Sequence, residues 1–69
     1  MRYQDFITSD HKVMLGKPVI KGTRLTVELL LRKLGEGATL SDLAEMYPGL
    51  SSDRIEAVLR YSLAVISND

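Results

Sequence analysis

The most informative stretch of the chain is Gly16-Lys17-Pro18-Val19-Ile20-Lys21-Gly22-Thr23-Arg24. Its Pro-Val-Ile run favours extended backbone, and Gly22 can adopt the positive φ that reverses the chain. The stretch therefore predicts a short strand followed by a tight turn. Thr26 is placed to cap a helix that begins at Val27, so the cations of the turn would lie beside a helix N-terminus, where an anion is stabilised.

The length of 69 residues predicts a single domain, with strands or an arm and the basic turn in residues 1–25 and a three-helix unit in residues 26–69. A core of this size usually supplies only about 3–5 kcal/mol, so small domains often gain stability from disulfides, metals or association. The sequence has no cysteine and a single histidine, His11, in a polar loop. Disulfides and thiolate metal sites are excluded, and a homodimer is expected.

The apolar segments are too short for a membrane protein. No apolar run approaches the roughly 18 residues that span a bilayer, and residues 1–15 lack the apolar core of a signal peptide. The sequence therefore predicts a cytoplasmic protein without a membrane partner.

The charges are divided between the two halves of the chain, although the net charge is zero. Residues 1–35 carry seven Lys/Arg and three Asp/Glu, whereas residues 36–69 carry two and six. This asymmetry indicates a basic face suited to nucleic acid and an acidic face suited to a basic protein, and random scatter of surface charge is the alternative.

The N-terminal residues predict short extended segments. Residues 1–8 alternate weakly between polar and apolar side chains, and Val13-Met14-Leu15 is too short for a helix, so we expect it to pair with Val19-Ile20. Two short strands are marginal in water without further cover. The N-terminal arm is therefore a candidate dimer contact.

Three amphipathic helices are expected after the turn. In the first, Glu28 and Arg32 form an i,i+4 pair, and Gly35 or Gly37 ends the helix. In the second, Thr39 and Asp42 resemble a capping box. The residues predicted to face the core are Val27, Leu30, Leu31 and Leu34 in the first helix and Leu40, Leu43, Ala44 and Tyr47 in the second, which Pro48-Gly49 ends.

The third helix is capped by Ser51 or Ser52 and has Ile55, Val58, Leu59 and Ile66 as its predicted inner face. Its second half is apolar on more than one side, which three helices alone would not cover. We therefore predict a dimer or partner surface there, formed by Tyr61, Leu63, Val65 and Ile66. The polar tail Ser67-Asn68-Asp69 is expected to fray.

Residues 41–66 have the spacing of a helix-turn-helix unit, but their composition argues against DNA reading by the third helix. Its first turns would present Ser52, Asp53, Glu56 and Ala57 outward, and carboxylates face phosphate unfavourably. Arg54 and Arg60 are the only cations there, and Glu56 lies i,i+4 from Arg60. These two arginines are the weaker nucleic-acid candidates.

The basic stretch is the stronger nucleic-acid or anion-binding candidate. Glu28 is the only carboxylate among its five cations, which are Lys17, Lys21, Arg24, Arg32 and Lys33. Binding through them would weaken steeply with salt. A solvated basic turn is the alternative, and the order Lys21-Gly22-Thr23 does not match a phosphate-binding P-loop.

Nothing in the sequence predicts an enzyme or a cofactor. Its acidic pairs are Asp42 with Glu45 and Asp53 with Glu56, and both lie in early helix turns. Carboxylates there offset the helix macrodipole, which explains them without catalysis.

Residues 7–66 resemble the prokaryotic domain-of-unknown-function family 433. The resemblance is carried by the motif Gly16–Arg24, the helix start at Thr26-Val27, Gly37, Tyr47-Pro48 and Leu50-Ser51. The resemblance implies a small, mainly α, homeodomain-like helix-turn-helix fold preceded by short strands. It also implies an antitoxin-like protein that binds and silences a PIN-like ribonuclease toxin and represses its own operon. Gly16, Pro18, Gly22 and Thr23 carry the motif as a structural and binding signature. One departure is His11 after Asp10, where family members commonly have proline.

Two other functions remain open at this point. A DNA-binding regulator without a toxin would bind duplex DNA as an isolated dimer. A protein-only adaptor would show no salt-dependent DNA binding.

Overall fold

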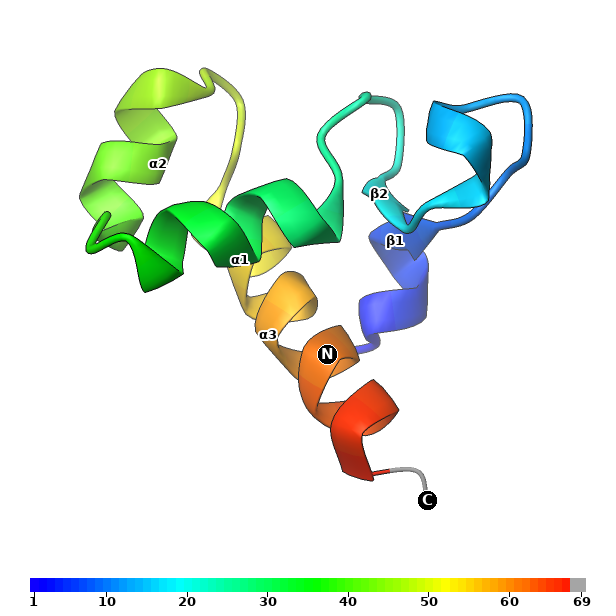
Figure 1. The fold of residues 1–69 in the computed structure, drawn as a ribbon. Helices are drawn as coiled ribbons and strands as arrows, with labels where there is room; N and C mark the ends of the chain where they lie inside the picture. The colour runs from blue at the N-terminus through cyan, green and yellow to red at the C-terminus, as the bar shows by residue number, and fades with distance from the viewer. Residues whose placement is uncertain (68–69) are drawn as a thin grey trace.

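The computed structural model describes residues 1–67, in which three helices follow a two-stranded antiparallel sheet (Figure 1). The strands are β1 (Ile7–Thr8) and β2 (Val19–Ile20), and the helices are α1 (Val27–Gly35), α2 (Leu40–Met46) and α3 (Ser52–Ser67). Short 3₁₀ turns at Tyr3–Asp5 and Met14–Gly16 precede the strands. The predicted mainly α class with short N-terminal strands is confirmed.

Side-chain caps start all three helices. The Thr26 hydroxyl accepts a hydrogen bond from the Leu29 N–H at 3.0 Å. Thr39 and Asp42 form a reciprocal capping box, with hydrogen bonds of 3.1 and 2.8 Å. The Ser51 hydroxyl accepts from the Arg54 N–H at 3.3 Å. Each cap satisfies backbone donors that have no partner within the helix, so the predicted helix starts are confirmed.

The core lies where α1, α2, α3 and the strands meet. Its most deeply buried large side chains are Val19, Ile20, Leu30, Leu43 and Val58, each less than 2% exposed. The Val19-Ile20 pair of the motif therefore belongs to the core, and the basic turn is attached directly to it.

The predicted inner faces are wrong at several positions. Leu31, Leu40, Ala44, Leu59 and Ile66 are exposed, whereas Ala57, predicted to face outward, is fully buried. Ala57 is buried because α3 packs against the N-terminal turn Tyr3–Asp5 as well as against α1 and α2. A second side of α3 is thereby covered, which its own periodicity does not reveal.

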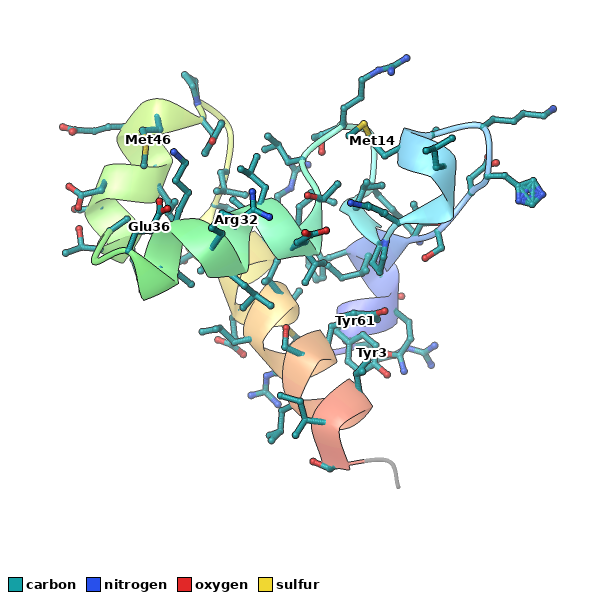
Figure 2. The ribbon with its side chains drawn as sticks, in the orientation of Figure 1. Tyr3, Met14, Arg32, Glu36, Met46 and Tyr61 are labelled. Atoms are coloured by element: carbon teal, nitrogen blue, oxygen red, sulfur yellow. The ribbon has the colours of Figure 1, made fainter. Side chains whose placement is uncertain are left out.

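The N-terminal prediction is partly wrong. Residues 3–5 form a 3₁₀ turn, and β2 pairs with β1 in the register Ile7↔Ile20 and Thr8↔Val19, not with Val13-Met14-Leu15. The first turn packs on α3, where the Tyr3 and Tyr61 rings meet edge to face with centroids 5.7 Å apart (Figure 2). The inner face of the arm is therefore used within the chain and is not free for a second subunit.

The longest helix is α3, which spans 16 residues. No helix within residues 1–67 is long and apolar enough to cross a membrane. Ser67 is the last residue of α3, and the rest of the tail predicted to fray, Asn68 and Asp69, lies outside the described residues.

Candidate interaction surfaces

The motif folds into a tight hairpin. The Thr23 N–H donates to the Ile20 carbonyl at 3.0 Å, and Gly22 sits between them at φ +78°. The Thr23 hydroxyl donates to the same carbonyl at 2.8 Å and accepts from the Leu25 N–H at 3.0 Å. Thr23 thus closes the turn that Gly22 permits.

The hairpin is also fastened to the start of α1. The Pro18 carbonyl accepts from the Val27 N–H at 2.9 Å, so it satisfies one of the free donors of the helix N-terminus. The Lys17 ammonium lies 2.9 Å from a Glu28 carboxylate oxygen. Pro18 therefore holds the hairpin against α1, Gly22 and Thr23 form its turn, and Gly16 at φ +83° ends the 3₁₀ turn before it.

Glu28 divides the predicted basic set. Its second carboxylate oxygen lies 3.0 Å from the Arg32 guanidinium, so one carboxylate bridges Lys17 and Arg32. The Lys17 ammonium, through its hydrogen bond and its charge, lowers the pKa of the Glu28 carboxyl below its ordinary value of 4.5, and Arg32 adds to this effect. Lys17 and Arg32 are therefore partly neutralised cations.

The other three predicted cations make no ion pair within residues 1–67. Lys21 and Arg24 are exposed on either side of the Gly22-Thr23 turn. Lys33 is half-buried on α1. It lies about 100° around the helix axis from Arg32 and therefore does not share the face of α1 on which Glu28 and Arg32 pair. The structure thus keeps Lys21 and Arg24 as the unneutralised cations of the hairpin.

A pH titration tests the Glu28 bridge. A carboxyl with a lowered folded pKa contributes stability well above its ordinary pKa, and this contribution is lost as the pH falls through the lowered value. Acidification should therefore lower the melting temperature of the native protein slightly more than that of Glu28→Gln, by a few degrees at most because the pair is exposed. Thermal melts at about pH 7 and about pH 3 measure the difference. Equal losses in both proteins would contradict the bridge.

The helix-three cations are engaged within the chain. Arg54 donates to the Gly49 carbonyl at 3.3 Å, across the turn between α2 and α3, and Arg60 pairs with Glu56 at 2.8 Å. Asp53 and Glu56 are exposed beside them. These contacts strengthen the compositional argument against α3 as a reader of the DNA groove.

The second half of α3 extends beyond the rest of the domain (Figure 1). We use "the apolar end of α3" for Leu59, Leu63, Val65 and Ile66, which are 46%, 65%, 58% and 77% exposed. A shallow apolar groove between this end and α1 is lined by Pro18, Val27, Leu31, Tyr61, Val65 and Ile66. The structure confirms that Leu63, Val65 and Ile66 are exposed, whereas Tyr61 is half-buried against Tyr3.

The structure also places the other titratable residues that the sequence singled out. No group of three or more His, Cys, Asp or Glu side chains within residues 1–67 could hold a metal ion. His11 is exposed in its loop, and Asp42 is used in the capping box.

Sequence reasoning did not single out the turn Met14–Gly16. Met14 and Leu15 have φ values of 50° and 57°, and Leu15 is 93% exposed. The left-handed backbone at two residues other than glycine has no signal in the sequence apart from the following Gly16.

The comparisons with known proteins give one match. The model of a family described as "protein of unknown function (DUF433)" matches residues 7–62. No curated protein and no solved structure matches the chain significantly.

Proposed function

Since the chain belongs to DUF433, a family of proteins of unknown function, we propose its function from its exposed surfaces: an antitoxin-like regulator that binds and neutralises a PIN-like ribonuclease toxin. The toxin class comes from the family resemblance of the sequence. In this proposal the chain acts in the cytoplasm and works by binding its partner, without catalysis and without a cofactor.

The apolar end of α3 is the observation that carries the proposal. Four large apolar side chains lie exposed on a helix end that projects from the domain. An isolated exposed leucine is ordinary, but Leu59, Leu63 and Ile66 follow one another at i, i+4 and i+7 on one face of α3, and an exposed apolar face of this kind marks a protein interaction site. An amphipathic helix presented to a groove is a recurring mode of protein recognition, and it suits an inhibitor that covers a partner.

We also assign a homodimer to the same surface when no toxin is bound. The domain is small enough that burial of this surface would add substantially to its stability. We place the dimer contact on α3 and not on the N-terminal arm, because the inner face of the arm already packs on α3 of its own chain.

Co-expression with the product of the adjacent gene tests the proposal. The expected result is that the adjacent protein alone arrests growth, that this chain restores growth, and that the two proteins purify together. An adjacent protein that neither binds this chain nor is relieved by it would overturn the antitoxin assignment.

A second candidate function, repression of its own operon, is favoured by Lys21 and Arg24. Both side chains are exposed beside the rigid Gly22-Thr23 turn and have no ion-pair partner within residues 1–67. Exposed cations without an internal partner are suited to DNA phosphates. Salt-dependent duplex binding that weakens when both become alanine would support this function, with or without a toxin. Absence of duplex binding would leave a protein-only adaptor.

A further inference from the structure

The turn Met14–Gly16 is the most strained segment in the described part of the chain. Met14, Leu15 and Gly16 have successive φ values of 50°, 57° and 83°, all in the left-handed region. For a residue other than glycine or asparagine this conformation costs roughly 1–2 kcal/mol. Hydrogen bonds from Gly16 N–H to the Val13 carbonyl and from Lys17 N–H to the Met14 carbonyl, both 3.1 Å, hold the turn in place.

Leu15 has no structural reason to be leucine. It is 93% exposed, so burial contributes nothing, and the backbone there would favour glycine or asparagine. A strained position that carries an exposed apolar side chain points to a function outside the folded domain.

The stretch of chain that contains Leu15 is rich in cations. Met14 lines a shallow hollow at the start of α1 together with Lys17, Arg24, Arg32 and Glu28, and Arg24 is the one of these three cations that Glu28 does not pair. Figure 2 shows Met14 directed toward the segment that leads into this helix. Residues 10–33 carry six Lys/Arg and two Asp/Glu, whereas the rest of the chain carries three and seven. The loop of residues 9–16 and the hairpin turn lie at the same end of the molecule, opposite the acidic α2 (Figure 1).

This combination favours nucleic acid over a protein partner or a lipid surface. Lysine is depleted at protein interfaces, whereas interfaces with DNA are strongly positive, and Lys12, Lys17 and Lys21 all lie near Leu15 in the chain. Two apolar side chains supply too little buried area for stable membrane attachment. A single apolar wedge is sufficient in DNA complexes, because phosphate contacts supply most of the affinity.

We propose that Leu15 is a wedge that enters between adjacent base pairs of duplex DNA, while Lys12, Lys21 and Arg24 contact the flanking phosphates. This inference rests on the DNA-binding function proposed above and is independent of toxin binding. The wedge would unstack one base step and bend the duplex, at a cost that the phosphate contacts repay.

The experiment uses the full chain and a fluorescent duplex of about 30 base pairs that contains 2-aminopurine at flexible pyrimidine–purine steps. Anisotropy measures affinity, and 2-aminopurine fluorescence measures unstacking. The test variant is Leu15→Asn, because asparagine tolerates the left-handed backbone and the folded domain should be at least as stable. The control is Met46→Asn, at an exposed apolar residue on the far side of the molecule (Figure 2).

We expect the native protein and Met46→Asn to raise 2-aminopurine fluorescence, and Leu15→Asn to abolish the rise and to bind about tenfold more weakly. Lys21→Ala/Arg24→Ala should reduce the slope of log affinity against log salt by about two. Unchanged unstacking and affinity in Leu15→Asn would overturn the wedge while leaving DNA binding intact. No duplex binding by the native protein, or Leu15-dependent binding only to phosphatidylserine vesicles, would overturn both the wedge and the DNA-binding function. Growth rescue is measured in a separate experiment, so none of these DNA-binding results decides whether the chain is an antitoxin.

Discussion

Replacing Leu30 with alanine is expected to unfold most of the domain at 25 °C. Leu30 is 1% exposed and belongs to the cluster that joins α1 to Ile20, Leu43 and Val58. Removing a buried leucine side chain costs about 2–5 kcal/mol, because apolar contacts are lost and a cavity remains. A domain of this size has about 3–5 kcal/mol in total. Urea titration followed by far-ultraviolet circular dichroism measures the loss.

The neighbouring residue supplies a matched control. Leu31→Ala makes the same chemical change one position along the same helix, where the side chain is 37% exposed. It should cost about 1 kcal/mol or less. The titrations should be compared at several protein concentrations, because self-association would add stability to each variant. Similar losses for Leu30→Ala and Leu31→Ala would contradict the assignment of Leu30 to the core.

The contrast between these two leucines shows what the sequence could and could not predict. Helix starts depend on local chemistry, and the roles of Thr26, Thr39, Asp42 and Ser51 were therefore predictable. The 3.6-residue period places Leu30 and Leu31 on one apolar stripe but does not say how much of the stripe a small domain can cover. That depends on which elements pack against it, which is a property of the tertiary fold.

The N-terminal segment was harder to predict for a related reason. Strand pairs of two residues have almost no periodic signal, and β1 was recognised only as part of an arm. Pairing of β2 with β1 and not with residues 13–15 is consistent with the left-handed turn at Met14–Gly16, which takes Met14 and Leu15 out of extended backbone, while Val13 is extended but bridges Asp10. Non-glycine residues in that conformation contradict their own preferences, so no propensity argument finds them.

The candidate interaction surfaces show the same division. Exposure of Leu63 and Val65 was predictable, because three helices are too few to cover them, whereas the periodicity of the third helix also placed the exposed Ile66 on its inner face. The five-cation set was predicted as one surface, and the structure separates it because Glu28 bridges Lys17 and Arg32. The i,i+4 pair was visible in the sequence, but the contact from Lys17 needs the hairpin to fold back on α1. The motif therefore combines contacts that hold the hairpin against α1 with two cations, Lys21 and Arg24, that take no part in those contacts.

Replacing Leu63 with lysine is expected to weaken the complex with the proposed toxin at least about 30-fold and to abolish growth rescue. Leu63 is 65% exposed at the apolar end of α3, so an ammonium there would be buried in the interface without a partner. The free domain should remain folded, because lysine forms helix readily and a cation near a helix C-terminus is favourable. Affinity is measured with purified proteins, and folding is checked by thermal melting.

The control is Met46→Lys, which places the same charge at an exposed apolar residue in the last turn of α2. It should bind and rescue like the native chain, because Met46 lies away from the apolar end of α3 (Figure 2). Sedimentation of the two variants without toxin tests the homodimer, which only Leu63→Lys should dissociate. If Leu63→Lys still neutralised the toxin, the interface would lie elsewhere on the domain. If it stayed dimeric yet failed to rescue, the apolar end of α3 would bind the toxin and the dimer would use another surface.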